Sequence, residues 1–202
     1  MIALLDNGQN LDDCEREVGG PVGQLLTPLT RYRLRDPARP WAIDNGGFKQ
    51  LDIPGLQRLL QREAHHRENC LFVAVPDMIC SAQRTLELFD HFAPMLEGWR
   101  AALVCQDGQE NLPIPWDRIA AVFIGGSTSW KCGPHVEAII KTAKILGKWV
   151  HIGRVNHPDR WSHFEALGAD SADGTGLARY SHMRLAIANR GQAPTLFDGA
   201  AA

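Results

Sequence analysis

Short apolar runs alternate along this chain with longer segments in which apolar residues recur at helical spacing. The apolar runs are typical of buried strands and cover residues 2–5, 22–27, 41–44, 71–75, 101–105, 119–124, 149–152 and a last short run that ends at Asp173. The helical segments cover residues 53–66, 81–96, 134–146, 158–167 and 178–189. This alternation is typical of a parallel α/β protein, and about eight strands predict a compact (β/α)8 TIM-like barrel.

The barrel is expected to be irregular near its start. The first two strands are separated by an acidic segment and by the breaker Gly19-Gly20-Pro21, in which we find no proper helix. We expect one domain over residues 1–190 and a flexible tail over residues 191–202, which is rich in small residues.

Composition excludes several classes of protein. The chain has 202 residues, 45% of them hydrophobic and 22% charged, which is ordinary for a globular domain. Its net charge of -2 leaves nucleic-acid binding to local basic patches. No apolar run reaches the roughly 18 residues of a membrane span and the N-terminus has no signal pattern, so we expect a cytoplasmic protein without a membrane partner.

The spacing of the cysteines and histidines does not indicate a metal site. The five cysteines are widely spaced and form no Cys-x-x-Cys pair, so we expect reduced and mostly buried thiols, with Cys105 the exception at a polar strand end. Of the eight histidines only His65 and His66 are adjacent, and neighbours in a helix point in different directions. The sequence therefore predicts neither a metal nor another cofactor.

Polar residues and glycines follow six successive predicted strands, where the carboxyl ends of a barrel would bring them to one mouth. These strand-end residues are Asp44, Asp77, Gln106, Gly125-Gly126, Gly153-Arg154 and Asp173. Residues 168–176 read Gly-Ala-Asp-Ser-Ala-Asp-Gly-Thr-Gly and hold Asp170 beside Asp173. Each aspartate alone has a structural alternative as a turn or helix-capping residue.

Three carboxylates and an amide without a metal cluster are suited to a reaction at an acetal-like carbon. One carboxylate attacks the anomeric carbon to give a covalent glycosyl intermediate, and another handles the proton.

Three segments resemble the tRNA-guanine transglycosylases and their relatives that insert 7-deazaguanine bases into DNA. Residues 43–50, Ile-Asp-Asn-Gly-Gly-Phe-Lys-Gln, are similar to the family's Asp-Ser-Gly-Gly-Phe-Gln motif. Residues 123–126 are similar to its Gly-Gly strand end, and residues 168–173 to its Gly-x-Asp-x-x-Asp segment. The resemblance implies that Asp173 is the nucleophile and Asp44 the general acid and base.

The resemblance also implies how a guanine or 7-deazaguanine base, such as preQ0, is bound. Asp77 would accept hydrogen bonds from the N1–H and amino groups, and Gln106 and the Gly126 amide, at the Gly125-Gly126 base-binding strand end, would serve the O6 side. An extruded nucleotide would stack on an aromatic side chain, for which Phe48 and Trp130 are the candidates. Asp170 is counted among the substrate-binding residues.

The acceptor is expected to be DNA rather than tRNA. The tRNA enzymes of the family carry a Cys-x-Cys-x-x-Cys and histidine zinc module after the nucleophile, whereas this sequence has no cysteine after Cys132. The basic run of Arg31, Arg33 and Arg35, together with Arg154, would contact phosphates, although a solvated loop is the favoured explanation of the run. A nucleoside or base hydrolase and a non-catalytic nucleic-acid-binding barrel remain alternatives, and the sequence leaves the oligomeric state open.

Overall fold

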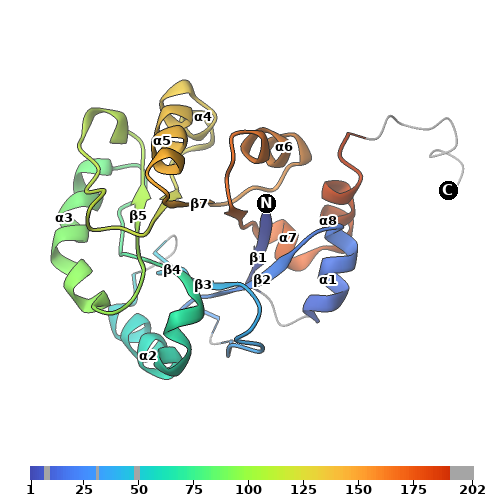
Figure 1. The fold of residues 1–202 in the computed structure, drawn as a ribbon, viewed down its shortest axis with the longest axis horizontal. Helices are drawn as coiled ribbons and strands as arrows, with labels where there is room; N and C mark the ends of the chain where they lie inside the picture. Colours follow the sequence, from blue (N-terminus) through green and yellow to red (C-terminus); the bar gives the residue numbers. More distant parts are fainter. Residues whose placement is uncertain (7–9, 31, 48–50, 192–202) are drawn as a thin grey trace, which may run out of the picture.

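The structure is a computed structural model that describes residues 1–6, 10–30, 32–47 and 51–191. Within these residues eight parallel strands form a closed barrel in the order of the sequence, with helices packed around it (Figure 1). The strands are β1 (Ile2–Leu5), β2 (Val22–Leu26), β3 (Trp41–Ile43), β4 (Cys70–Ala74), β5 (Ala101–Cys105), β6 (Ala121–Ile124), β7 (Trp149–Ile152) and β8 (Ser171–Ala172). The predicted (β/α)8 barrel is confirmed.

A helix is found in each of the five predicted helical segments. They are α1 (Leu11–Val18), α2 (Ile53–Glu63), α3 (Ala82–Phe92), α4 (Thr128–Lys131), α5 (Pro134–Ile145), α6 (Pro158–Ala166), α7 (Thr175–Arg179) and α8 (Ser181–Ala188). There are also three 3-10 turns among the described residues. Turn η1 (Ala64–Asn69) extends α2, η2 (Ala93–Leu96) extends α3, and η3 (Gln109–Asn111) follows β5. The single helix expected over residues 178–189 is wrong at its start, because the extended backbone of Tyr180 separates α7 from α8.

The expectation that no helix joins the first two strands is wrong. Helix α1 lies there, and the side chain of Asn10 caps its start by accepting a hydrogen bond from the Asp12 amide. Leu11, Cys14 and Val18 are buried at helical spacing, while the acidic residues between them face outward.

Two connections are irregular instead. Between β5 and β6 the described residues hold only the 3-10 turn η3, and between β2 and β3 they contain no helix. Gln24 of β2 is 2% exposed and holds this loop through two hydrogen bonds. Its Nε2 donates to the Arg33 carbonyl oxygen at 2.9 Å, and its Oε1 accepts from the Arg35 amide at 3.0 Å. A buried amide therefore fastens the loop to the barrel where a helix would normally pack.

Alternate strand residues fill the inside of the barrel. The interior cluster contains Leu4, Leu25, Ala42, Phe72, Ala74, Ala102, Val104, Ala121 and Phe123. A second and larger cluster lies between the strands and the helices. Because side chains fill the barrel, a ligand site is confined to its mouth.

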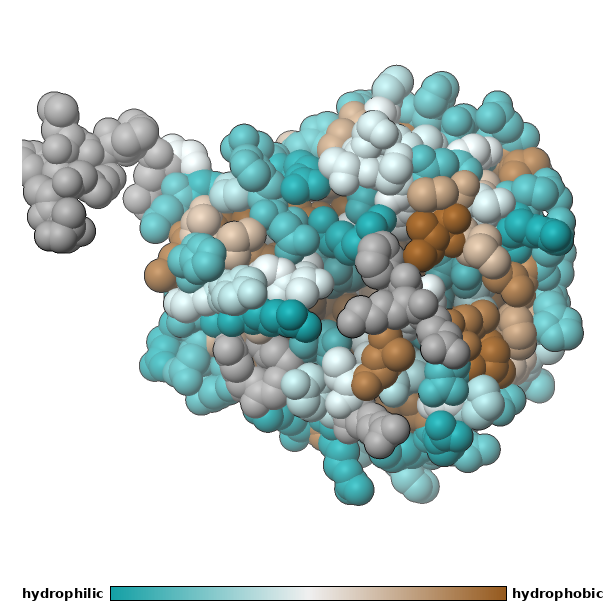
Figure 2. All heavy atoms as spheres, turned by 180° about the vertical axis from the view of Figure 1, so that it is seen from behind, coloured by the Kyte–Doolittle hydropathy of each residue, from teal (hydrophilic) through white to brown (hydrophobic). Residues whose placement is uncertain are grey.

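The last helix closes the ring by packing on the first, and Figure 1 shows α8 beside α1. Arg184 of α8 is 3% exposed, and its guanidinium donates to the Glu17 carboxylate and to the Leu177 carbonyl oxygen. On the face seen in Figure 2, apolar residues form small groups among hydrophilic ones. Among the described residues, none of the helices combines the length and apolar character that crossing a membrane requires.

Candidate active site

A pocket of about 670 Å³ opens at the carboxyl ends of the strands. Four aspartates of the described residues line it, namely Asp6, Asp44, Asp77 and Asp173. Gln106, Gly125, Gly153 and Arg154 also line it, so the structure brings together residues from all six predicted strand ends. A volume of this size is typical of small-molecule sites.

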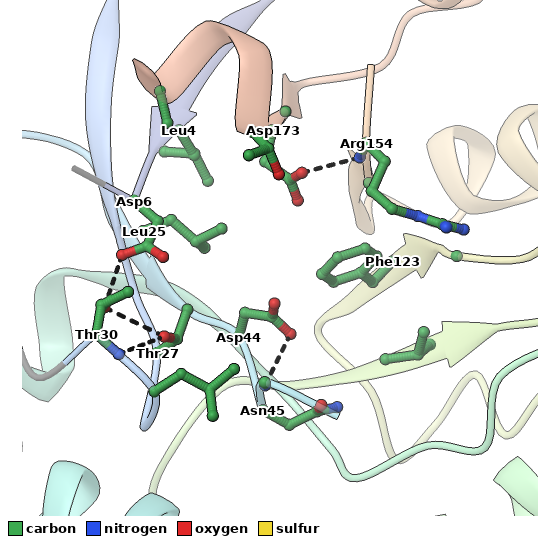
Figure 3. Close-up of a pocket in the computed structure, with 18 of the residues that line it drawn as sticks. Leu4, Asp6, Leu25, Thr27, Thr30, Asp44, Asn45, Phe123, Arg154 and Asp173 are labelled. Carbon is green, nitrogen blue, oxygen red and sulfur yellow. Dashed lines mark hydrogen bonds between the residues drawn. The ribbon is translucent and has the colours of Figure 1, made fainter. Parts of the chain in front are cut away.

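Asp44 follows β3 and points into the pocket toward the space that Asp173 also faces (Figure 3). Burial raises the pKa of Asp44 to about 7, and the negative charges of Asp173 and Asp77 add to this effect. The amide of Gly46 donates weakly to Asp44 Oδ1, at 3.4 Å. A carboxyl group with this pKa exchanges a proton readily near neutral pH.

Asp77 is held rigidly by two side-chain amides. Asn45 Nδ2 donates to its Oδ1 at 2.9 Å, and Gln106 Nε2 donates to its Oδ2 at 2.6 Å. Burial raises the pKa of Asp77, while these two hydrogen bonds oppose the rise. Each carboxylate oxygen keeps a further acceptor position for a ligand.

Gln106 is held in turn by the backbone. Its Oε1 accepts from the amides of Gly126 at 2.9 Å and Cys80 at 3.0 Å. The expectation that the Gly126 amide serves the substrate is therefore wrong in this conformation, because Gln106 already occupies it. Gly125 lines the pocket as expected, and a Cβ there would lie 2.7 Å from Gln106 Nε2.

Asp173 follows β8, and its carboxylate receives a hydrogen bond on each oxygen. The Arg154 amide donates to Oδ1 at 2.8 Å, and His151 Nε2 lies 3.0 Å from Oδ2. Arg154 has φ 60°, a left-handed conformation that is costly for a residue with a Cβ. The backbone is thus strained at the residue whose amide binds Asp173.

Asp6 was not among the predicted site residues, although it follows the predicted strand of residues 2–5 as Asp44 follows its own. Thr30 Oγ1 donates to Asp6 Oδ1 at 2.7 Å. Burial raises the pKa of Asp6, the Thr30 hydrogen bond opposes this, and the charge of Asp173 adds to the rise. Asp6 could have been predicted from the sequence, because it follows the carboxyl end of a strand, where the site residues of such barrels lie.

A buried lysine behind the site was not predicted either. Lys131 is 4% exposed, and its Nζ donates to the Gly153 carbonyl oxygen. Burial lowers the pKa of Lys131 to about 8, the positive charge of Arg154 lowers it further, and the charge of Asp173 opposes the shift.

Asp170 does not belong to the pocket. Because β8 contains only two residues, Asp170 and Asp173 flank opposite ends of it, and Asp170 lies at the amino end. Its carboxylate accepts from Lys144 Nζ at 2.6 Å and from the Val150 amide at 2.8 Å. The prediction that Asp170 binds substrate is therefore wrong, and its role is to pin α5 and β7 to β8.

The arginines predicted to contact nucleic acid do not all lie in the same place. Arg154 lines the pocket, whereas Arg33 and Arg35 are exposed on the loop that Gln24 fastens to the outer side of β2. Arg31 and Phe48 lie outside the described residues. Trp130 is half-buried behind Gly126 and donates from Nε1 to Glu110 at 2.7 Å.

Cys105 is buried, and burial raises the pKa of its thiol to about 12, so the expectation of a more exposed thiol there is wrong. Among the described residues, Cys80 and Cys132 are the exposed cysteines. No group of three or more metal-binding side chains is found in the part of the chain that the structure describes.

Comparison of the chain with protein-family models finds no matching model, and comparison with curated proteins finds no match. The function is therefore inferred from the pocket and from the sequence motifs.

Proposed function

We propose that this barrel is a base-exchange transglycosylase that replaces guanine in a nucleic acid by a 7-deazaguanine derivative such as preQ0. DNA is favoured over tRNA as the acceptor on the sequence grounds given above. The observation that carries the proposal is the meeting of Asp44 and Asp173 in one pocket, with Asp77 fixed beside them. The two carboxyl groups have different environments, as an acid and a nucleophile require.

In the first half of the reaction, a carboxylate oxygen of Asp173 attacks C1′ of the guanosine. The C1′–N9 bond breaks, its electron pair leaves with guanine, and the Asp44 carboxyl group donates a proton to the departing base. The product is a covalent ester between Asp173 and the sugar.

In the second half, the Asp44 carboxylate removes the N9 proton of the incoming base. N9 attacks C1′, the ester bond breaks, and Asp173 returns to a carboxylate. Two displacements retain the configuration at C1′. Asp44 ends protonated, as it began, so no external acid or base is consumed.

Base recognition is assigned to Asp77 and Gln106. Asn45 and Gln106 each take one acceptor position of Asp77, which leaves one position on each oxygen for the N1–H and amino groups of guanine. Gln106 Nε2 has a second hydrogen, which would donate to O6.

The target nucleotide must leave its stack to reach the pocket, at a cost of about a few kcal/mol. Tyr32 and Phe123 line the pocket, and Tyr32 is 39% exposed at its rim. Tyr32 is therefore placed to stack on an extruded base.

The test is incubation of the protein with labelled preQ0 and, separately, with duplex DNA and tRNA. We expect label to enter DNA with the parent protein and not with Asp173→Asn or Asp44→Asn. Asp90→Asn is the matched control, because Asp90 is exposed on α3 and pairs with Arg118 far from the pocket lining. Mass spectrometry after a denaturing quench, without incoming base, should find a sugar adduct on Asp173.

Each rival has its own outcome. Release of guanine with no incorporation of label would mean a hydrolase. Binding of base or DNA that survives Asp173→Asn, with no reaction in the parent, would mean a non-catalytic barrel. Label in tRNA alone would overturn the preference for DNA.

A further inference from the structure

A chain of hydrogen-bonding side chains runs inside the barrel from β7 and β8 to Asp173. Trp149 Nε1 donates to Ser171 Oγ at 2.9 Å. Ser171 Oγ lies 2.9 Å from His151 Nδ1, and His151 Nε2 lies 3.0 Å from Asp173 Oδ2. His151 and Ser171 are direct neighbours in the register of the two strands, which is why the contacts fit without a turn.

The first and last members of this chain determine which atom donates in each of its hydrogen bonds. The indole nitrogen of Trp149 is only a donor, so Ser171 Oγ accepts from it and has its own hydrogen to give. The Asp173 carboxylate can only accept, so His151 Nε2 carries a hydrogen and donates it. In a neutral imidazole Nδ1 then has no hydrogen, and it accepts the one that Ser171 has to give.

The imidazole is held firmly by its apolar surroundings. His151 is fully buried, and its ring centroid lies 5.0 Å from that of Phe72 and 4.5 Å from that of Phe123. Rotation of the ring would break both of its hydrogen bonds in a place that water does not reach, which is costly.

The opposite oxygen of Asp173 is bound from the backbone. The Arg154 amide donates to Oδ1, as the dashed line in Figure 3 shows. With one donor on each oxygen, the plane of the carboxylate is set. The side chain of Asp173 keeps 14% of its surface exposed, so the remaining lone pairs face the pocket.

We propose that His151, oriented by Trp149 and Ser171, is the positioning residue that donates from Nε2 to Asp173 and aims this carboxylate as an anion at the anomeric carbon. The proposal rests on the proposed function. His151 keeps its Nε2 hydrogen throughout and exchanges no proton. Its hydrogen bond weakens when Asp173 becomes an ester and recovers when the carboxylate departs, so it favours the second displacement.

The hydrogen bond is tested first, without any substrate. In the parent protein labelled with ¹⁵N-histidine, NMR should find His151 with a hydrogen on Nε2 and none on Nδ1. Asp173→Asn should move the Nε2 resonance, whereas Ser162→Ala, on the exposed side of α6, should not. A bare Nε2 in the parent would overturn the proposal whether or not the protein is active.

The positioning role is tested by kinetics. Ser171→Ala leaves His151 Nδ1 without its partner, and we expect kcat for base exchange to fall about tenfold to a hundredfold with KM unchanged, as when an orienting group is lost. Trp149→Phe should act in the same direction but more weakly. Ser162→Ala should match the parent.

The outcomes separate the two proposals. A folded Ser171→Ala protein with the kcat of the parent would overturn the role of His151 while base exchange stands. A parent that transfers no label would remove the proposed function, and the NMR measurement would still decide whether His151 donates to Asp173.

Discussion

The negative charge of Asp173, on the strand end of β8, helps to raise the pKa of Asp44, on the strand end of β3, to about 7. The two residues lie more than a hundred positions apart in the sequence and face the same pocket. Burial is the largest cause of the shift, and the charge of Asp173 is the next. The nucleophile that we propose thus helps to keep its partner protonated near neutral pH, which is the state that the first displacement requires.

The first prediction tests this coupling directly. Asp173→Asn removes the charge but nearly keeps the shape, so the pKa of Asp44 should fall while remaining above its ordinary value, because burial persists. Carbon NMR of the aspartate carboxyl groups as a function of pH measures it. Asp90→Asn should leave the Asp44 titration in place, and an unchanged titration in Asp173→Asn would show that the two groups do not interact.

The second prediction concerns stability and pH. The pKa of Asp44 is raised on folding, so between its ordinary value of 3.8 and about 7 the folded protein holds a proton that the unfolded chain has released. The stability that this proton provides is therefore present at low pH and is lost as the pH rises through about 7. Asp44→Asn has no charge to bury and avoids this loss, so at pH 8 it should raise the free energy of unfolding by about 4 kcal/mol.

Thermal unfolding at two pH values measures this effect. Asp44→Asn should raise Tm by about 8–16 °C at pH 8 for a chain of this size, with little change at pH 4. The same variant should be inactive, so a site residue would be limiting the stability of the fold. A variant less stable than the parent at pH 8 would contradict the raised pKa.

The barrel and most of its mouth could be predicted from the sequence because both follow from a periodic signal. A buried strand that ends in a polar residue is visible one strand at a time, and the closed parallel topology then brings Asp44, Asp77 and Asp173 together. Asp6 obeys the same rule and was missed because the residues that follow it were not recognised as a helix.

Other features depend on register and on element ends, which the sequence does not show. His151 meets Asp173 only because β7 and β8 pair residue 151 with residue 171. Asp170 and Asp173 were both predicted as site residues because they are only three positions apart. The two-residue strand β8 lies between them, so they are at opposite ends of the barrel. The position of Gln106 at a strand end can be predicted from the sequence. The hydrogen bond that it accepts from the Gly126 amide cannot, because that bond depends on the side-chain rotamer.

The third prediction concerns the tight packing behind the base-binding wall. A Cβ at Gly125 would lie 2.7 Å from Gln106 Nε2 and 3.0 Å from Val104 Cγ1, so in Gly125→Ala the Gln106 amide must shift, and we expect its hydrogen bond to Asp77 to be disturbed. We expect a loss of about 1–3 kcal/mol in the free energy of unfolding, as for overpacking elsewhere. Binding of guanine, followed by calorimetry, should weaken as well.

Gly20→Ala is the matched control, because a Cβ there would have no neighbour within 4 Å. It should change the free energy of unfolding by about 0.5 kcal/mol or less. Guanine binding in Gly125→Ala equal to that of the parent would mean that Gln106 is not part of the base-binding wall.

The fourth prediction concerns the strained backbone at Arg154. Its φ of 60° directs the amide toward Asp173 Oδ1, and this conformation costs a residue with a Cβ about 1–2 kcal/mol. Arg154→Ala and Arg154→Gly remove the same side-chain contacts and keep the same amide, but only glycine adopts this conformation readily. The glycine variant should therefore be more stable than the alanine variant by about 1 kcal/mol in urea unfolding. Equal stability of the two variants would mean that residue 154 relaxes once its side chain is gone, and the amide would then no longer be held in place for the nucleophile.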